Sequence, residues 1–571
     1  MTPLQKPFRP ALHGFAFLAA SILLCLLLAA CTAGSPSATA TASTTLPAPQ
    51  ATAEPLPEPT ANPPVTPAPS ATAAPPAPSI WLPDSLPLIL RDALVIPEGW
   101  QKSVEPDPSD LQIRVVPSDD PDPGFSTWIY ALVAPFPTVT DAVTAQELRQ
   151  FWTSGSFEGL PFQKLLIEST AQSILAAHWG DPSGAVQVAN PDRLVEDSWN
   201  TPGAWAIVPF EQLEPRWKVI QIDAQSPVQK TFDASDYPLA VRFTLVGDPA
   251  LRERFLSEVD LPDGNRDPEK LTTVVLTGVT ALVRGTAALM EVIGLTYPAQ
   301  DIGPWLREAD ILHISNEVPF ARNCPQPFDW KDLVFCSQTE YITLLEDVGA
   351  DVIELTGDHF ADWGPDAMLY TLELYQERGW PYYGGGANLE EAQQPALLEH
   401  NGNKIAFIGC NGKEPGYATA SADMPGAGHC DFAVMTEEIR QLRSGGYLPI
   451  VTFQHLEYYQ YVALPELQID FHQMSAAGAA IVSGSQAHHP HAFEFRDEAF
   501  MHYGLGNLFF DQTNQGDEPR TAFIDRHIVY DGRHISTELL TIYLVDYARS
   551  RPMNPDEREA LLSAVFSASG W

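Results

Sequence analysis

The segment ADVIELTGDH, residues 350–359, is an apolar run that stops at Asp358 and His359, two side chains able to bind a metal ion. Four further apolar runs stop in the same way at small or polar residues: VVLTGVTALVRG (274–285), ADILHISNE (309–317), LPIVTFQH (448–455) and AAIVSGSQAHHPH (479–491). Such runs predict buried strands. Because ligands bind outside the carboxyl ends of the strands of a largely parallel sheet, we expect these ends to form one site.

The residues expected to converge there carry carboxylate, amide and imidazole groups. They are Asn316, Glu317, Asp358, His359, His455 and His488. A single histidine after a strand is more simply explained as a loop or core residue, but repetition at successive strand ends favours a common site. Mixed ligands of this kind suit Mn, Fe or Zn.

Helical segments alternate with these strands. They are PDAMLYTLELYQERG (365–379), MTEEIRQLRSGG (435–446) and PELQIDFHQMSAAG (465–478). Each carries apolar residues at helical spacing and runs into glycine, which terminates helices without steric penalty in a left-handed conformation. The alternation predicts the α/β fold class.

The composition limits the number of domains and the kinds of molecule that the chain can bind. The chain has 571 residues, 45% of them hydrophobic, which is enough for roughly two to four domains. It contains 72 acidic and 32 basic residues, a formal net charge of -40. This charge would repel a phosphate backbone and therefore excludes nucleic acid as a partner. An acidic polymer would be repelled as well unless cations bridge the two.

Residues 1–31 have the features of an export signal. Basic residues precede an apolar stretch at 15–30, which ends in the sequence LAAC with Cys31 last. This ending resembles the bacterial lipobox, which implies that Cys31 becomes lipidated and anchors the chain to the cell membrane on its extracytoplasmic side. An uncleaved anchor helix is the alternative. Residues 32–79, rich in Ala, Pro, Thr and Ser, predict a disordered tether.

Four further cysteines are spaced as two local pairs, Cys324 with Cys336 and Cys410 with Cys430. In an oxidising compartment two local disulfides are the simplest pairing, although four cysteines allow three connectivities. The CxxC spacing of a zinc ribbon is absent.

Residues 80–247 predict a smaller α/β domain. Its segments are STWIYALVAPFPTV (126–139, strand-like), TAQELRQFWTSG (144–155, an amphipathic helix), AWAIVPFEQL (204–213) and RWKVIQID (216–223). The order of strand, Pro-rich turn and helix resembles the phosphate-type periplasmic solute-binding proteins. We assign no ligand residue here, and we expect residues 248–271 to form an interdomain linker.

The second region carries a series of motifs. They are ADILHISNE, GADVIELTGDHFADWG, NLEEAQQPALLEHNGNKIAFIG, QHLEYY, GAAIVSGSQAHHPHAFEF and YGLGNLFFDQ. This series resembles the CapA-type proteins of bacterial capsule and poly-γ-glutamate biosynthesis, whose domain is related to calcineurin-like metallophosphoesterases. The resemblance implies a four-layer α/β sandwich over residues 272–545, a helical tail at 546–571, and a role in the synthesis or export of such a polymer.

The resemblance also implies roles for individual residues. Metal ligands are expected at Glu317, Asp358, His359, His455 and His488, with His489 and His491 as alternatives to His488. Catalytic roles are expected for His359 and His455, and substrate contacts for Arg284, Asn316 and Asn507.

Three positions depart from the family pattern. Where the family has Gly-Asp after its first strand, this chain has Gly278 and Val279, and valine cannot coordinate a cation. Ser485 or Gln486 stands where a histidine is common, and Leu456 replaces a tryptophan. Loss of a primary ligand should weaken or abolish at least one ion site of a two-metal centre, which leaves one divalent ion or none.

Two functions are consistent with this sequence. The first is a metal-dependent hydrolase or transferase acting on a surface polymer or phosphoester. The second is a catalytically degenerate lipoprotein of the same fold that binds or assembles the polymer, and a solute receptor built on the first region is a third alternative. The expected partners are the membrane through the lipid on Cys31, an anionic surface polymer and capsule-synthesis membrane proteins.

Overall fold

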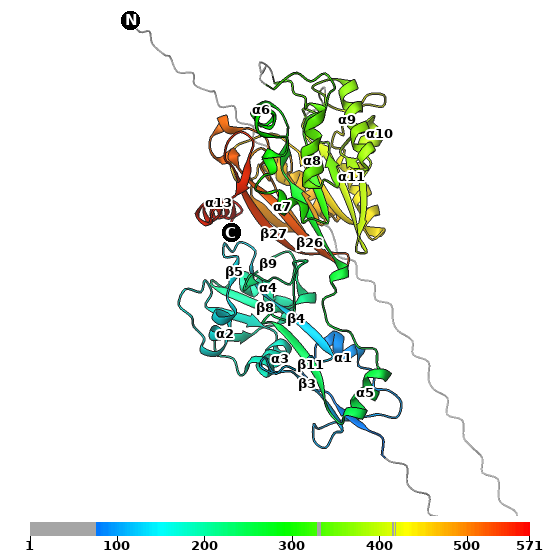
Figure 1. The fold of residues 1–571 in the computed structure, drawn as a ribbon, viewed down its shortest axis with the longest axis vertical. Helices are drawn as coiled ribbons and strands as arrows, with labels where there is room; N and C mark the ends of the chain where they lie inside the picture. The colour runs from blue at the N-terminus through cyan, green and yellow to red at the C-terminus, as the bar shows by residue number, and fades with distance from the viewer. Residues whose placement is uncertain (1–75, 328–332, 414–415, 417) are drawn as a thin grey trace, which may run out of the picture. The chain divides into compact units, whose positions relative to one another are not determined.

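Two α/β regions follow one another in the computed structural model, which describes residues 76–327, 333–413, 416 and 418–571 (Figure 1). The predicted signal, Cys31 and almost all of the predicted tether lie outside the described residues. Within the described ranges, no helix is both long and apolar enough to cross a membrane.

The N-terminal lobe is built on one mixed sheet in the order β2-β1-β3-β11-β4-β8-β6-β7, with β9 also paired to β4. Its strands are β1 (Ser79–Trp81), β2 (Gln101–Ser103), β3 (Leu111–Val115), β4 (Ser126–Pro135), β6 (Lys164–Ile167), β7 (Val186–Val188), β8 (Ala204–Pro209), β9 (Trp217–Val219) and β11 (Ala240–Gly247). Its longer helices are α2 (Ala145–Ser154) and α3 (Ser169–Trp179). A capping box of Thr144 and Glu147 begins α2. Gly155, with φ 81°, ends the helix where the sequence predicts its end.

The predicted linker at 248–271 is wrong in part, because it contains helix α5 (Pro249–Glu258). The Asp248 side chain caps this helix. Phe255 is completely buried, and its ring lies 5.1 Å from that of Trp100. The helix therefore belongs to the N-terminal lobe. The sequence does not indicate this, because Phe255 is its only buried residue and has charged neighbours in the sequence.

The C-terminal domain contains two large sheets and a two-stranded one formed by β17 (Gly385–Gly386) and β20 (Gly426–Ala427). The first has the order β16-β15-β14-β12-β26-β27-β28 and consists of β16 (Tyr382–Tyr383), β15 (Val352–Glu354), β14 (Ile311–Asn316), β12 (Leu271–Thr277), β26 (Thr521–Tyr530), β27 (Arg533–Leu544) and β28 (Ser550–Pro552). The short strand β13 (Val279–Thr280) pairs with β14 and with β25 (Asn507–Phe509). The second has the order β18-β19-β21-β22-β24-β23 and consists of β18 (Ala396–His400), β19 (Asn403–Asn411), β21 (Leu448–Gln454), β22 (Ile481–Ser483), β24 (Ala499–His502) and β23 (Phe493–Arg496).

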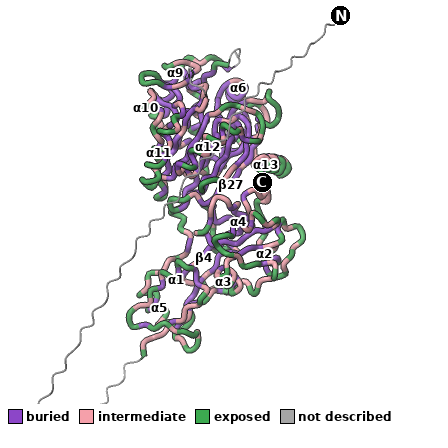
Figure 2. Tube along the Cα trace, turned by 180° about the vertical axis from the view of Figure 1, so that it is seen from behind, coloured by how far each residue is buried: buried purple, intermediate pink, exposed green. Residues whose placement is uncertain are grey.

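The two large sheets pack face to face and are covered by helices on their outer faces, which gives four layers. Val274 and Ile311 of the first sheet share a core with Phe407 and Ile450 of the second. The outer face of the first sheet packs on α6 (Arg284–Ile293), α7 (Gly303–Arg307), α8 (Ile342–Val348) and α9 (Pro365–Arg378). The outer face of the second packs on α11 (Phe432–Ser444) and α12 (Pro465–Ala477). Figure 2 shows the buried interior between exposed outer surfaces. Strands buried on both faces explain the nearly continuous apolar runs.

Two differences from the predicted helices have local causes. Helix α11 begins at Phe432, earlier than predicted, because the Asp431 side chain caps it by accepting two backbone N–H groups. The predicted C-terminal tail forms α13 (Pro555–Ala568), and its Leu562 and Phe566 are buried in the core between the sheets. The tail is therefore part of the domain.

Phe136 of the N-terminal lobe, directly after β4, is buried in the core of the C-terminal domain. Its ring makes edge-on contacts with Phe493, Phe500 and Phe566 at centroid distances of 5.8, 5.6 and 6.2 Å. Such aromatic contacts are specific and bury a large apolar area.

Candidate metal centre

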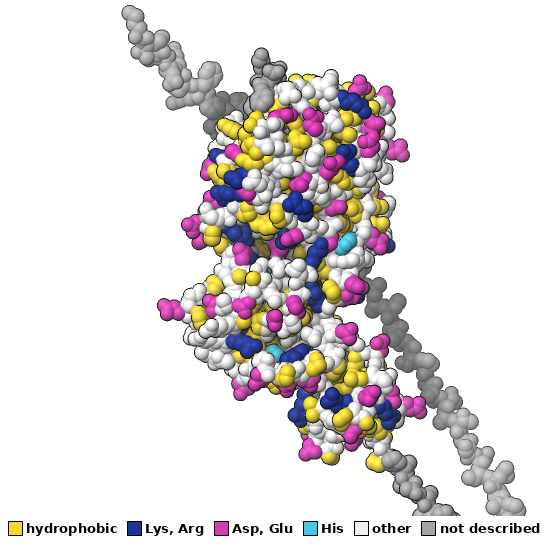
Figure 3. Space-filling view, in the orientation of Figure 1, with side chains coloured by type: hydrophobic (Ala, Val, Ile, Leu, Met, Phe, Trp, Pro, Cys, Tyr) yellow, Lys and Arg dark blue, Asp and Glu magenta, His cyan; other side chains and the backbone are white. Residues whose placement is uncertain are grey.

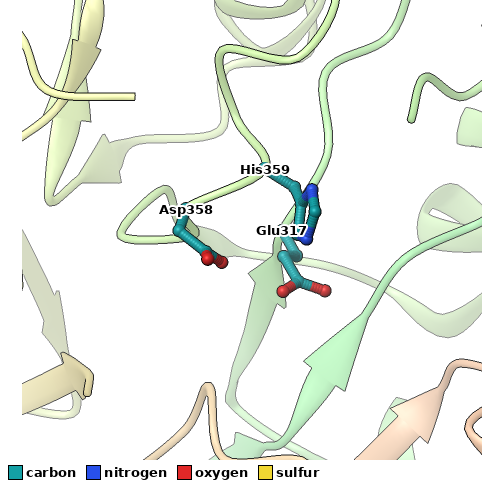
Figure 4. Close-up of side chains that lie close together, drawn as sticks. All are labelled: Glu317, Asp358 and His359. Atoms are coloured by element: carbon teal, nitrogen blue, oxygen red, sulfur yellow. The ribbon is translucent and has the colours of Figure 1, made fainter. Parts of the chain in front are cut away.

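The carboxyl ends of β14 and β15 bring Glu317, Asp358 and His359 together (Figure 4). One ligand atom of each lies within 4.8 Å of the others. The approach depends on Gly357, because a Cβ atom there would lie 2.7 Å from the Glu317 Cα. The sequence prediction that these strand ends meet is therefore realised for these three side chains.

Glu317 is held in a buried position. It is 1% exposed, and its backbone N–H donates to the Thr280 carbonyl oxygen at 3.0 Å. The buried Oδ1 atom of Asp358 makes no hydrogen bond to any described residue, and the buried Oε1 atom of Glu317 has only the His488 imidazole nearby, at 3.4 Å. Buried carboxylate oxygens are costly unless they are paired or bind a cation. The residues therefore fit a divalent metal ion.

His359 is oriented by a neighbouring carboxylate. Its Nδ1 lies 2.7 Å from Asp362 Oδ2, and the Phe335 backbone N–H donates to the same oxygen at 2.7 Å. Burial lowers the pKa of His359, but the hydrogen bond to Asp362 and the charges of Glu317, Asp362 and Asp358 together raise it to about 9. A carboxylate on one imidazole nitrogen fixes the ring and leaves the other nitrogen for a metal, an arrangement common around metal sites.

His488 is the histidine of its motif that faces Glu317. Its Nε2 lies 3.4 Å from Glu317 Oε1, and its Nδ1 lies 2.8 Å from Asn507 Oδ1. His489 and His491 instead bond to the carbonyl oxygens of Pro490 and Gln460. Among the three alternatives, the geometry therefore places His488 at the site.

His455 lies at the border of the site. It lines a small cavity together with His488, but it is not in the group formed by Glu317, Asp358 and His359. Its Nε2 lies 2.9 Å from Asp470 Oδ2, and its buried Nδ1 has no hydrogen-bond partner among the described residues. The Nδ1 atom is thus free to act as a ligand or acceptor.

Two of the predicted substrate contacts are buried. Asn316 is 0% exposed, and its Nδ2 donates to the Val318 carbonyl oxygen and the Tyr375 hydroxyl group. Asn507 is 3% exposed, orients His488 and donates to the Pro519 carbonyl oxygen. Both amide groups donate to other parts of the protein, and their predicted contact with substrate stays a prediction.

Arg284 remains beside the site. Its guanidinium group lies 2.6 Å from Asp511 Oδ1 and 4.9 Å from the centre of the Phe510 ring. Burial raises the pKa of the Asp511 carboxyl group to about 6 despite this ion pair. Arg284 is partly exposed, so its predicted contact with substrate stays a prediction.

Val279 faces an apolar cluster instead of a metal. It is completely buried and shares a cluster with Ala281, Val283, Val318, Phe335 and Phe510. The rings of Phe335 and Phe510 lie 4.8 and 5.2 Å from those of His359 and His488. The side of the site where the family carries an aspartate is therefore hydrophobic.

Sequence reasoning missed two charged residues of the site. Lys413 Nζ lies 2.6 Å from Asp358 Oδ2 and 2.7 Å from Glu457 Oε1. The signal was present, since Lys413 follows the apolar run of β19 and Glu457 comes two residues after His455. Applying the strand-end argument to β19 would have found the lysine.

Both predicted disulfides occur as local pairs near these loops. Cys324 bonds to Cys336 with a Cα–Cα distance of 5.8 Å, and Cys410 bonds to Cys430 with one of 5.0 Å. Cys336 directly follows Phe335, and Cys410 lies shortly before Lys413 in the sequence.

The four-layer architecture and the metal-capable strand ends define an α/β sandwich domain with a candidate metal centre. Residues 242–512 match the family model of the bacterial capsule synthesis protein PGA_cap. This part of the chain is therefore similar to the bacterial capsule synthesis proteins that the model describes.

Two curated proteins are similar to the same part of the chain. The chain is 24% identical over 265 residues to the capsule biosynthesis protein CapA of Bacillus anthracis, covering 45% of this chain and 64% of that protein. It is 25% identical over 241 residues to the PGA biosynthesis protein CapA of Bacillus subtilis, covering 41% and 61%. The chain thus spans slightly less than two thirds of either relative.

Two solved structures align with parts of this chain. A 5'-nucleotidase precursor from Thermus thermophilus aligns with 52% of this chain and 58% of its own, at 13% identity and a TM-score of 0.29. A possible phosphate binding protein from Planctomyces limnophilus aligns with 32% of this chain and 86% of its own, at 13% identity and a TM-score of 0.26.

Proposed function

We propose that this chain takes part in the synthesis or export of a capsule polymer of the poly-γ-glutamate kind, and that its C-terminal domain uses one divalent cation to do so. The polymer class is suggested by the names of the two relatives. The observation that carries the cation is the convergence of Glu317, Asp358 and His359, with buried oxygens that have no hydrogen-bond partner among the described residues.

Glu317, Asp358 and His359 would hold the ion, and His488 and His455 would complete the set. Carboxylate and imidazole ligands suit Mn, Fe or Zn. A bound ion of this kind supplies Lewis acidity for hydrolysis or transfer at a carbonyl or phosphoryl group. The protein itself contributes the Asp362 contact that orients His359 and the hydrophobic wall around Val279, which excludes water from one side.

We also propose that the chain is anchored to the outer face of the membrane through a lipid on Cys31 and meets its polymer and capsule-synthesis membrane proteins there. Acidic and basic side chains are interspersed on the face shown in Figure 3. With a net charge of -40, contact with an anionic polymer needs bridging cations, so binding should depend on salt and divalent ions. Replacing Cys31 with Ser should move the chain from the membrane fraction to the soluble fraction.

A second candidate is a polymer-binding or assembly lipoprotein without turnover. It is favoured by Val279, because the apolar cluster around this residue leaves no ligand for a second ion on that side among the described residues. Turnover of poly-γ-glutamate by the metal-loaded chain, followed as a change in polymer length, separates the two candidates.

The metal content of the purified full-length chain tests the proposal. Elemental analysis should find about one equivalent of divalent ion, fewer than the two of a two-metal hydrolase. The double variant Glu317→Ala, His359→Ala should lose it. The matched control is Glu494→Ala, His472→Ala, which removes a Glu–His pair 2.9 Å apart outside the site and should keep the ion. Absence of metal from the wild-type chain would overturn the proposed centre.

A further inference from the structure

Lys413 joins two carboxylates at the edge of the candidate metal centre. Its ammonium group lies 2.6 Å from Asp358 and 2.7 Å from Glu457. The side chains of Lys413, Asp358 and Glu457 are 19%, 25% and 31% exposed, so the group is largely withdrawn from solvent. Charge pairs in such a place are screened less than surface pairs.

The loop that carries Lys413 is fixed at several points. The Gly412 N–H donates to the Gln454 carbonyl oxygen at 2.7 Å, and the Lys413 N–H donates to Asn411 Oδ1 at 2.9 Å. The Asn411 side chain in turn donates to the Thr356 carbonyl oxygen at 2.9 Å, two residues before Asp358. The disulfide at Cys410 closes the same segment. The ammonium group is therefore positioned by the fold, unlike that of a free surface lysine.

Asp358 connects Lys413 to the candidate ion position. Its Oδ2 atom accepts from the lysine, while its Oδ1 atom has no hydrogen-bond partner in the described part of the chain. Asp358 also belongs to the group formed with Glu317 and His359. The Asp358 carboxylate thus contacts the Lys413 ammonium group through one oxygen and keeps the other oxygen for the candidate ion. A bridging carboxylate binds two metal ions in the same way.

The charges support the same interpretation. Three carboxylates face the candidate ion position or Lys413 directly, Glu317, Asp358 and Glu457, while Asp362 pairs with His359. One divalent ion and one ammonium group together balance their three negative charges. On the opposite side, Val279 and its apolar neighbours provide no ligand.

We propose that the Lys413 ammonium group is a built-in replacement for the second metal ion of a two-ion centre. It pairs permanently with Asp358 and Glu457 and supplies one positive charge there, so the site takes a single divalent ion. This inference rests on the metal centre proposed above. The inference also explains how the fold tolerates Val279. Because the Lys413 side chain replaces the second metal ion, that ion no longer needs a ligand at position 279.

Removing the lysine charge should open a second ion site between Asp358 and Glu457. The experiment measures the stoichiometry of Mn²⁺ bound by the purified full-length chain, by elemental analysis after dialysis and by calorimetric titration. The variants are Lys413→Met and Lys413→Gln, two neutral replacements, and Lys413→Arg, which keeps the charge. Lys404→Met is the matched control, because Lys404 lies at the other end of β19 and pairs with the Tyr447 ring.

We expect about one equivalent in the wild type, Lys413→Arg and Lys404→Met, and about two in a folded neutral variant at position 413. Adding Glu457→Gln to Lys413→Met should return the stoichiometry to that of the wild type, because one of the two new ligands is lost. Circular dichroism identifies which neutral variant folds.

The outcomes separate this inference from the proposed function. Unchanged stoichiometry in the folded neutral variants, or two ions in the wild type, would overturn the role of Lys413 while leaving the metal centre intact. A wild type without metal would overturn the proposed function. In that case the role of Lys413 survives only if a neutral variant gains an ion that Lys404→Met does not.

Discussion

Two central strands of the N-terminal lobe, β4 and β8, are followed by aromatic residues, whereas β14, β15 and β21 of the C-terminal domain are followed by carboxylates and histidines. Strand β4 is followed by Phe136 and β8 by Phe210, and both rings pack on the C-terminal domain, Phe210 at 4.9 Å from Tyr530. Strands β14 and β15 deliver Glu317 and Asp358, each of which has one buried oxygen without a hydrogen-bond partner among the described residues. Similar α/β architecture thus serves as an interface in one region and as a site in the other.

Charged groups show the same contrast. In the N-terminal lobe, Asp141 is satisfied twice, by Lys218 at 2.7 Å and by Arg558 of α13 at 2.9 Å. Around Glu317, by contrast, buried carboxylate oxygens are still able to bind a cation. A strand end becomes a candidate site when its polar groups are buried and still able to bind something. The solute-receptor alternative loses support, because the aromatic strand ends of the lobe are covered by the neighbouring domain.

The largest expected effect comes from truncating the aromatic contact of the lobe. Phe136→Ala should lower the free energy of unfolding by about 3–5 kcal/mol, because a fully buried ring is replaced by a cavity. Metal stoichiometry should not change. Leu88→Ala, which truncates a side chain that is 67% exposed, is the control. Urea denaturation followed by tryptophan fluorescence measures both, and a cost below about 1 kcal/mol for Phe136→Ala would contradict the structural role of this ring.

A smaller effect should appear with pH at Lys218. Burial lowers the pKa of this lysine from 10.5 to about 8, although Asp141 opposes the shift. Since the folded pKa lies below the unfolded one, the penalty for the charged form is complete below pH 8 and disappears towards pH 10.5. Stability should therefore rise across this range, by up to about 3 kcal/mol.

The Lys218→Met variant isolates this contribution. We expect it to lack the rise in the urea midpoint between pH 8 and pH 10 that the wild type shows. Lys270→Met is the control, because Lys270 is 48% exposed and pairs with Asp531 at 3.6 Å. An identical pH dependence in the wild type and Lys218→Met would show that the charge of Lys218 does not limit stability.

The smallest effect concerns the residue that orients His359. Asp362→Asn should weaken divalent metal binding by about 10- to 100-fold, because the second ring nitrogen of a ligating histidine loses its carboxylate partner. Asp366→Asn, an exposed position in the first turn of α9, is the matched control. Calorimetric titration with Mn²⁺ measures both, and equal affinities would remove Asp362 from the metal centre.

The predicted parts of the site share a local signal. Glu317, Asp358 and His359 each follow an apolar run directly, so the strand and the residue at its end are read from adjacent positions. The family resemblance implies substrate contacts at Asn316 and Asn507, but the side chains at these positions turn into the protein and hold Tyr375 and His488. Proximity to a strand end does not specify side-chain direction.

The sequence by itself determined the α/β class, the polar strand ends, the glycines that end the helices and the local spacing of the cysteines. These properties depend on residues that lie near one another in the chain. The tertiary structure alone decided that Lys413 meets Asp358, 55 residues away, and that Phe136 enters a core built from residues beyond 270. The physical reason is that long-range contacts depend on how the sheets pack, and sheet packing leaves no periodic signal in the sequence.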